Sequence, residues 1–355
     1  MKIIITPNKG CDDGKGMLKM TFNWSKVTRD IGKYKLMGPK RGIILACVAK
    51  VPETYYNINI LFMLTNLHEV KYTLSQDLKL TNIVLGLTSH SSKYPCPYGE
   101  CYRDNKTGDW IKGVNRTVSS LNEHQKKWCS VTKCNRDRLK EYFNCESKPL
   151  LTCDEENTPI LYRIPPPPLH AILLSPVNHI IQHLMIHYPD LVNVLHDLSI
   201  QKANYHGKSF EGNQCKLILK NIEKLNIPNN LIEFKNVLLK LKNLHFVCNS
   251  EILPCSYTKV IDEFTSAWFK LKKKYFISTP PKIHILIHHL EDYFDETQLS
   301  LLKTTDEVVE SFHQVLFKRM SKGYSVKDIF NPNHGTRLLR LINRINSYNL
   351  RIINN

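Results

Sequence analysis

The chain has 355 residues, of which 42% are hydrophobic and 23% are charged, a composition typical of a globular protein that excludes an intrinsically disordered chain. Its formal net charge of +17 at pH 7 favours a polyanionic partner, with nucleic acid ahead of an anionic membrane surface. No apolar run reaches the length of a transmembrane helix, and the apolar segment at residues 2–6 is too short for a signal peptide, so the sequence predicts neither.

The eleven cysteines bear on the cellular compartment. Their number is odd, no export signal accompanies them, and a chain of this length needs no disulfide bonds to be stable. We therefore expect a reducing compartment, in which most cysteines are buried thiols and a few are metal ligands.

The first part of the chain is rich in strand signals. From apolar, β-branched or alternating patterns, strands are predicted at residues 2–6, 17–24, 43–51, 56–64 and 70–74. The first two flank a turn-rich segment and predict a hairpin with acidic residues at its bend. Asp77 follows the last strand, and residues 78–87 predict a helix. The pattern therefore places acidic residues at the ends of strands.

The remainder of the chain changes character twice. Residues 88–160 are rich in Cys, Ser, Asn and Lys and predict irregular structure, and the proline-rich segment 164–170 predicts a stiff extended spacer. Beyond it, apolar residues recur with a helical period at residues 171–198, 214–225, 229–246, 257–276, 281–293, 304–322 and 336–349. The sequence therefore predicts a strand-rich beginning followed by a helical part.

Acidic residues form the first candidate site. Asp12 (or Asp13) and Asp77 lie at predicted strand ends, and Glu310 lies beside an apolar stripe in the helix predicted over residues 304–322. Carboxylates suit Mg²⁺ or Mn²⁺, and a pair of such ions activates water or a 3′-hydroxyl and stabilises the leaving oxygen of a phosphodiester. The alternative is that the aspartates serve only turns and that Glu310 borders an amphipathic helix.

A zinc site is the second candidate. Cys96 and Cys101 offer two thiolates, and the segment from His284 to His289 offers two or three imidazoles, so that two cysteines and two histidines would make a normal tetrahedral set. The spacing of the cysteines is loose, which leaves other groups in competition with this one.

Two rival groups have comparable spacing. Cys129 and Cys134 repeat the spacing of the first cysteine pair, and His179, His183 and His187 recur every four residues on one predicted helical face. Because no glutamate of an HExxH pattern accompanies the histidine stripe, we interpret the stripe as a packed polar face.

Basic residues near the C-terminus are candidates for contact with DNA phosphates. They are Lys318 and Arg319 at the end of the helix predicted over residues 304–322, and Arg337, Arg340 and Arg344 on one face of the last predicted helix. A lysine run at residues 270–274 follows two aromatic residues. The alternative is a solvated helix face, but the net charge favours phosphate contact.

Taken in this order, these pieces resemble motifs of the Transib transposases and of the related catalytic subunit of the V(D)J recombinase. The resemblance is carried by Gly10 to Gly16 with Asp12, by Asp77-Leu-Lys79, by Cys96 and Cys101, by Leu169-His170, by Phe210 to Lys216, by His284 and His289, and by Glu307-Val-Val-Glu310-Ser. Together the motifs extend over nearly the whole chain. The family's cysteine pair has two intervening residues, whereas four residues separate Cys96 from Cys101.

The resemblance implies a fold and a set of domains. The expected class is α+β, with an RNase H-like mixed sheet and a large, mostly α-helical, zinc-bearing insertion before the last catalytic helix. The implied domains are residues 1–92, which carry the first two catalytic acids, residues 93–303, which form the insertion, and residues 304–355, which form the catalytic and basic helices.

The resemblance also implies roles for individual residues. Asp12, Asp77 and Glu310 would hold two Mg²⁺ or Mn²⁺ ions, and His170 would be a further catalytic residue at the scissile phosphate. One structural Zn²⁺ would be held by Cys96, Cys101, His284 and His289.

The implied function is that of an enzyme, a transposase or recombinase that works in the nucleus. It would nick DNA at transposon ends and then transesterify, leaving a hairpin on flanking DNA. The partner is double-stranded DNA, the family works as a dimer, and neither a membrane nor a small-molecule substrate is expected. The resemblance begins at the first catalytic strand, so we expect a transposon-derived core without the region that recognises terminal repeats. The alternative is a catalytically inactive, transposon-derived DNA-binding protein.

Overall fold

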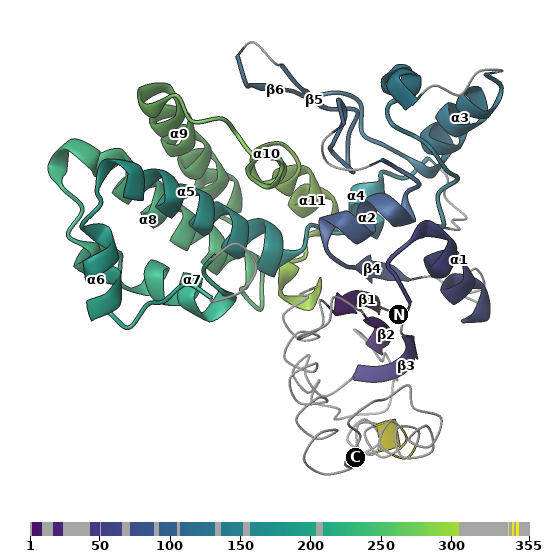
Figure 1. The fold of residues 1–355 in the computed structure, drawn as a ribbon, viewed down its shortest axis with the longest axis horizontal. Helices are drawn as coiled ribbons and strands as arrows, with labels where there is room; N and C mark the ends of the chain where they lie inside the picture. Colours follow the sequence, from purple (N-terminus) through teal and green to yellow (C-terminus); the bar gives the residue numbers. More distant parts are fainter. Residues whose placement is uncertain are drawn as a thin grey trace. The chain divides into compact units, whose positions relative to one another are not determined.

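The computed structural model of the protein describes residues 2–8, 17–23, 43–49, 51–65, 72–88, 92–104, 107–131, 136–151, 157–203 and 209–304, with residues 340, 343, 346 and 347. Over these residues the fold is mixed α/β and predominantly helical (Figure 1). The chain divides into two compact units. The sheet unit contains Met1–Ser92 and Arg116–Pro165, and the helical unit contains Lys93–Asn115 and Pro166–Thr304. The three domains expected from the sequence stay a prediction.

A four-stranded sheet lies in the sheet unit. Its strands are β1 (Lys2–Asn8), β2 (Met17–Asn23), β3 (Ile43–Ala49) and β4 (Thr73–Ser75), in the spatial order β3-β2-β1-β4. The predicted hairpin of β1 and β2 is confirmed, with Ile5 opposite Met20, and β3 continues the antiparallel pairing with Cys47 opposite Met20. Strand β4 pairs with β1 in parallel. The register therefore places Ile5, Met20 and Cys47 next to one another across three strands, and Met20 is fully buried.

One predicted strand is wrong. Residues 56–64 form a helix, α1 (Tyr55–Leu64), rather than a strand. Thr54 caps its N-terminus by accepting a hydrogen bond from the backbone N–H of Asn57 at 3.3 Å. The buried residues Ile58, Leu61 and Phe62 follow the i, i+3, i+4 spacing of a helix. The cap and this spacing outweigh the weak strand preference of the β-branched residues in the segment.

The segment predicted to be irregular, residues 88–160, contains regular structure. Helix α3 (Val118–Cys129) starts at a capping box in which Thr117 and Ser120 exchange side-chain and backbone hydrogen bonds. A 3₁₀ helix (Arg136–Tyr142) and the short helix α4 (Ile160–Arg163) follow. The polar composition of the segment gave no helical signal, because α3 buries only one narrow stripe of residues that ends at Trp128.

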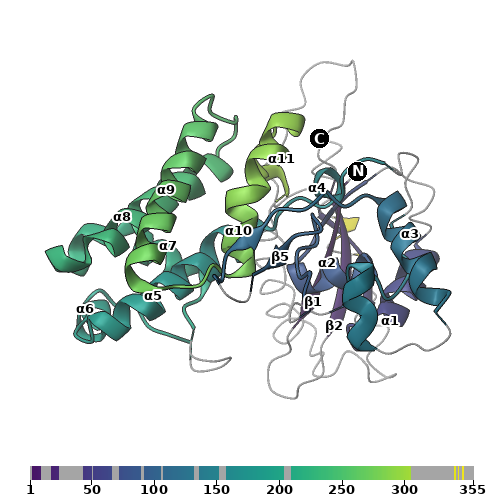
Figure 2. The ribbon, with the colours of Figure 1, turned by 90° about the horizontal axis from the view of Figure 1, so that it is seen from above.

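Besides short 3₁₀ helices at Ile222–Leu225, Asn229–Leu231 and Leu301–Thr304, the helical unit contains helices of seven to nineteen residues, which Figures 1 and 2 show from two directions. They are the π-helix η3 (Pro168–Leu174), α5 (Ser175–His187), α6 (Leu191–Asp197), α7 (Gly212–Lys220), α8 (Ile232–Cys248), α9 (Tyr257–Tyr275), α10 (Pro281–His288) and α11 (Leu290–Thr297). Elements η3 and α5 pack against α8 and α10, and α8 packs along α9. A small hairpin of β5 (Tyr102–Arg103) and β6 (Trp110–Ile111) belongs to the same unit.

Three helix boundaries differ from the prediction. The spacer expected over residues 164–170 is extended only as far as Pro167, because η3 begins at Pro168 with proline in its first turn. The helix expected over residues 171–198 is interrupted before Pro189, which separates α5 from α6. The helix expected over residues 281–293 is interrupted at His289.

One helical stretch, Pro168–His187, is long and apolar enough by length and composition to cross a membrane, although the sequence predicted none. Half of the stretch is buried inside the protein, and Ala171, Ile180 and Leu184 have no exposed surface. A core helix of a folded domain passes the same test, and this stretch packs as one.

Candidate metal centre

Four side chains with metal-binding atoms meet inside the helical unit. Cys96, Cys101, His284 and His289 are all buried, and their ligand atoms lie within 4.8 Å of one another. The Nε2 atom of His289 is 3.2 Å from the Sγ atom of Cys96 and 3.7 Å from that of Cys101. A tetrahedral zinc ion sets its ligand atoms about 3.3–3.8 Å apart. The group therefore has the composition and nearly the spacing of a closed structural zinc site.

The cysteine half of the site is a tight loop shaped by backbone groups. The backbone N–H groups of Tyr98 and Gly99 donate to the Cys96 sulfur, and the N–H of Gly113 donates to the Cys101 sulfur at 3.5 Å. A Cβ atom on Gly99 would lie 2.7 Å from the Cys101 sulfur, so this position has no room for a side chain. The loop thus brings the two thiols together despite the four residues between them.

Gly113, which follows β6 and contacts the cysteine loop, likewise has no room for a side chain. A Cβ atom on Gly113 would lie 2.1 Å from the backbone oxygen of Glu100. The N–H of Glu100 in turn donates to the backbone oxygen of Val114 at 2.8 Å. The chain that leaves β6 therefore runs directly against the residue before Cys101, which only glycine permits.

The histidine half of the site depends on a break between two helices. His284 and His289 are five positions apart, and on a continuous α-helix their side chains would point about 140° apart. His289 ends α10 and precedes α11, with φ −128° and ψ −17°. The break turns its ring toward that of His284, and the ring centroids lie 5.2 Å apart at 86°. The two imidazoles therefore reach one site.

The buried histidines have polar atoms without partners. Both ring nitrogens of His284 and the Nδ1 atom of His289 are buried and have no hydrogen bond of normal geometry among the described residues, although the Cys101 sulfur is close enough to His284 to affect its pKa. Burial lowers the pKa of His284 to about 4, which keeps the ring neutral, the form that binds a metal. Such unpaired nitrogens destabilise a dry site, and a metal ion would satisfy them.

The two thiols differ in their ionisation. Burial raises the pKa of the Cys96 thiol, whereas a hydrogen bond from Cys96 lowers the pKa of the Cys101 thiol. Both directions favour a thiolate at Cys101 that accepts a hydrogen bond from the Cys96 thiol. Because thiolates are the form that ligates zinc, metal binding would displace the remaining proton.

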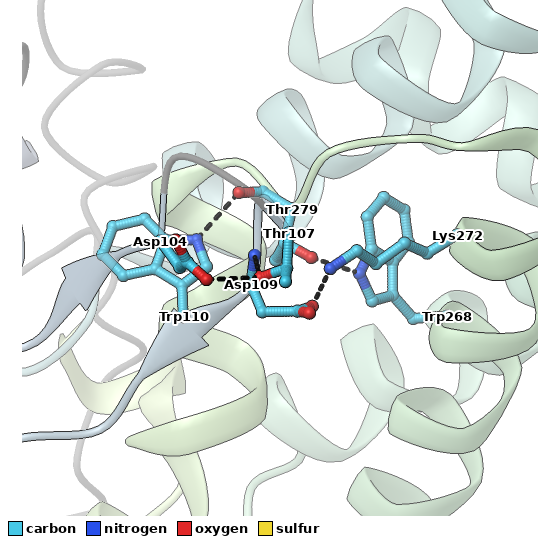
Figure 3. Close-up of polar contacts among 7 residues, drawn as sticks. All are labelled: Asp104, Thr107, Asp109, Trp110, Trp268, Lys272 and Thr279. Carbon is cyan, nitrogen blue, oxygen red and sulfur yellow. Dashed lines mark hydrogen bonds and ion pairs between the residues drawn. The ribbon is translucent and has the colours of Figure 1, made fainter.

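Aromatic packing and polar contacts hold the histidine half in place, and Figure 3 shows the polar contacts of Trp110, Trp268 and Lys272 beside it. The Trp110 ring of β6 stacks on the His284 ring, with centroids 4.0 Å apart at 13°. Trp110 Nε1 donates to the backbone oxygen of Thr279 at 2.8 Å, and Trp268 Nε1 donates to the Thr279 hydroxyl at 3.0 Å. An ion pair of Lys272 with Asp109 joins the same hairpin to α9. No sequence pattern singled out these residues, although Trp110 lies three positions before Gly113 in a cysteine-rich stretch.

The two alternative candidates for a metal site are the cysteine pair Cys129 and Cys134 and the histidine stripe on α5. Cys129 is exposed, and Cys134 lies outside the described residues. On α5, the His179 ring packs near Trp268 and His183, and burial lowers its pKa to about 4. His187 contacts Phe234 and Tyr275. The described residues of the stripe thus contact aromatic side chains, and the interpretation of the stripe as a packed polar face stays a prediction.

Only one of the three predicted catalytic acids can be placed. Asp77 follows β4 and is the N-cap of α2 (Leu78–Val84), where its Oδ1 atom accepts a hydrogen bond from the N–H of Leu80 at 2.8 Å. Asp12 (with Asp13) and Glu310 lie outside the described residues. Whether the three carboxylates converge therefore stays a prediction.

The remaining predicted site residues are spread over both units. His170 is half-buried in η3, next to Leu169, whose side chain would be 3.0 Å from a Cβ atom on Gly212. Two motifs of the resemblance, Leu169-His170 and the segment around Gly212, thus contact each other. Arg340 is exposed and helical, and the other basic candidates, Lys318, Arg319, Arg337 and Arg344, lie outside the described residues.

No protein-family model matches the chain, and no curated protein matches it either. The fold and the site therefore define it as a mixed α/β protein with a buried Cys₂His₂ group that can bind a metal such as zinc.

Proposed function

We propose that this protein is the catalytic core of a DNA transposase or recombinase that cleaves and transfers DNA strands with two divalent metal ions. The observation that carries the proposal is the meeting of Cys96, Cys101, His284 and His289. The resemblance to the Transib transposases selects these four out of eleven cysteines and fifteen histidines. Since His289 is 188 residues from Cys101 in the chain, chance convergence is a poor explanation.

The sheet supports the same proposal. The order β3-β2-β1-β4, with β1 and β4 parallel inside an otherwise antiparallel sheet, is the arrangement expected of an RNase H-like fold. Parallel strands end at the same edge of a sheet, and Asp77 lies two positions after the end of β4. Asp12 follows β1 by four positions in the sequence. This connectivity favours a shared metal site for the two aspartates.

Asp77 has a carboxylate oxygen to spare for a metal ion. Its Oδ1 atom caps α2, and its Oδ2 atom accepts no hydrogen bond from the described residues. Bound Mg²⁺ or Mn²⁺ would activate the attacking hydroxyl and neutralise charge on the leaving oxygen. In this proposal Asp12, Asp77 and Glu310 hold the ions, His170 orients the scissile phosphate, and Lys318, Arg319 and the terminal arginines hold the DNA backbone.

The Cys₂His₂ group has a separate, structural role in the proposal. A bound zinc ion would cross-link the Cys96–Cys101 loop, which immediately precedes β5, to the break between α10 and α11. Both halves lie in the helical unit, and Trp110 and Thr279 already bring them into contact. The chain's own residues thus fix the site, and the ion would stabilise it.

The test is metal-dependent nicking of supercoiled plasmid DNA. We expect nicking with Mn²⁺ or Mg²⁺ and a loss of at least about 100-fold in Asp77→Asn and in Glu310→Gln. Asparagine caps helices as well as aspartate does, so Asp77→Asn leaves α2 capped. The matched control is Asp190→Asn, which changes the exposed aspartate that precedes α6. Full nicking activity in both acid variants would overturn the proposal, and DNA binding without nicking would favour an inactive DNA-binding protein.

A further inference from the structure

A groove between α7 and α8 is a concave surface, among the described residues, that the proposed function does not use. It has a volume of about 330 Å³. Helix α7 lines it with Lys216 and Lys220, one turn apart, and α8 lines it with Lys242, His245, Phe246 and Asn249. These spacings place each set on a single helix face, and the two helices pack against each other in the helical unit (Figure 1).

The residues that line the groove are basic and neutral. Three lysines line it and no carboxylate does. Elsewhere on the same pair of helices, lysines have acidic partners, since Lys240 pairs with Glu263 at 2.8 Å and Lys235 pairs with Glu223. In the described part of the chain, neither Lys220 nor Lys242 forms an ion pair. The groove is therefore a site of concentrated positive charge and not one more mixed surface.

A second hollow, between α8 and α9, provides the contrast. It has a volume of about 520 Å³, and its lysines, Lys240, Lys259 and Lys270, lie beside Asp262 and Glu263. An anion entering that hollow would meet carboxylates as well as lysines. The difference between the two hollows selects the α7–α8 groove for a negatively charged ligand.

An aromatic ring stands at the groove. Phe246 is 70% exposed, while Leu244 and Val247 beside it in α8 are buried in the core. An exposed phenylalanine does not help the fold, because its ring remains in water. Lysines that contact phosphates and an aromatic ring that stacks on a base are the combination by which proteins bind single-stranded nucleic acid.

We propose that the α7–α8 groove binds a single strand of DNA, with its phosphates on Lys216, Lys220 and Lys242 and one base stacked on Phe246. The bases of an intact duplex are stacked on one another, so the exposed ring has a partner only in an unpaired strand. The volume suits one nucleotide unit and not a duplex. The choice of DNA rests on the proposed function, because nicking and strand transfer produce unpaired DNA.

The experiment measures fluorescence anisotropy of a labelled oligothymidine and of a labelled DNA duplex with the full chain over a range of salt concentrations. For the triple variant Lys216→Gln, Lys220→Gln and Lys242→Gln we expect the negative slope of log affinity against log salt to become less steep by about 2 for the single strand. The matched control is Lys240→Gln, Lys259→Gln and Lys270→Gln from the second hollow, for which we expect a smaller change.

The stacking contact is tested separately. Phe246→Ala should weaken oligothymidine binding about tenfold or more and leave duplex binding unchanged, whereas Phe246→Trp should retain the affinity. The control is Phe269→Ala, which removes another partly exposed phenylalanine from α9. Unchanged oligothymidine binding in both Phe246→Ala and the triple lysine variant would overturn the inference.

The remaining outcomes separate this inference from the proposed function. Equal losses of duplex and single-strand affinity in the lysine variant, with no effect of Phe246→Ala, would identify a duplex-binding surface and overturn the single-strand assignment. Efficient competition by inorganic tripolyphosphate, again with no effect of Phe246→Ala, would identify a phosphate site and overturn it as well. If the wild-type chain binds neither the single strand nor the duplex, both the inference and the proposed function fail. If the wild-type chain nicks plasmid DNA but the groove variants bind oligothymidine as well as the wild type does, only the inference fails.

Discussion

The two halves of the Cys₂His₂ group reach the same point by different means. The cysteine half is positioned by the backbone, through N–H groups that donate to sulfur and through Gly99 and Gly113, where a side chain would collide. The histidine half is positioned by packing, through the Trp110 ring on His284 and the helix break at His289. The comparison teaches that the loop half has a fixed shape of its own, whereas the helical half depends on its neighbours.

Removal of the metal is expected to have the largest effect on stability, because the two halves of the site then lose the ion that links them. We expect purified protein to contain about one zinc ion per chain. Removal by a chelator, or Cys96→Ser, should cost several kcal/mol and lower the Tm of the helical unit by about 10 °C or more. Cys129→Ser is the control, since this exposed thiol lies outside the group. Elemental analysis that finds no zinc, with a Tm that chelators leave unchanged, would remove the metal centre.

The substitution Gly113→Ala disturbs only the cysteine half of the site. Its Cβ atom would stand 2.1 Å from the Glu100 backbone oxygen, so the loop must shift. We expect a loss of roughly 3 kcal/mol in unfolding free energy and weaker zinc retention, measured by denaturation and by metal analysis after dialysis. Gly108→Asn is the matched control, because asparagine tolerates the φ of +66° and meets only ordinary contacts there. Equal effects of the two changes would show that the close approach at Gly113 does not hold the site.

The substitution Trp110→Leu disturbs the histidine half of the site. The variant loses the stack on His284 and the hydrogen bond to Thr279, and we expect zinc affinity to fall about tenfold in competition with a chromogenic chelator. The control is Trp128→Leu in α3, a buried tryptophan of the sheet unit that should destabilise the protein without changing zinc affinity. A zinc affinity that is unchanged in Trp110→Leu would mean that the helix break alone positions the imidazoles.

The histidine stripe on α5 gives a smaller effect that depends on pH. Burial lowers the pKa of His179 from 6.5 to about 4, so between these values the unfolded chain is protonated and the folded ring stays neutral. Stability should therefore fall by about 2 kcal/mol as the pH drops from 6.5 to 4, after allowance for partial exposure. His183, Trp268 and the Ser278 backbone surround this ring.

The measurement is urea denaturation across this pH range. His179→Gln should flatten the pH dependence, and His196→Gln, which changes an exposed histidine of α6, should leave it unchanged. An identical acid profile for wild type and His179→Gln would contradict the assigned cause.

Local pattern in the sequence predicted much of the fold. The β1–β2 hairpin and the periods of α8 and α9 follow from alternation and from the 3.6-residue repeat. The helix α1 was missed because the prediction weighed β-branched residues above the cap at Thr54. Local signals of this kind are read within a few residues, and errors arise where two of them compete.

The candidate site depends on information that local pattern does not contain. Spacing alone left three metal groups open, and only the resemblance selected Cys96 with His289. The support from Trp110 and Thr279 joins segments 169 residues apart, so no window of sequence could show it. The helix break at His289 was also invisible, because an apolar period continues across it.

The long separation between the two halves has a consequence for synthesis in the cell. Cys101 leaves the ribosome 188 residues before His289, which at about 5–20 residues per second is a delay of about 10–40 s. During that interval the thiols have no imidazole partners and are open to oxidation or to binding by other metals. A nascent chain that forms the tight loop around Gly99 early would hold the two sulfurs close together, and it would then be exposed to an unwanted disulfide between the two cysteine ligands.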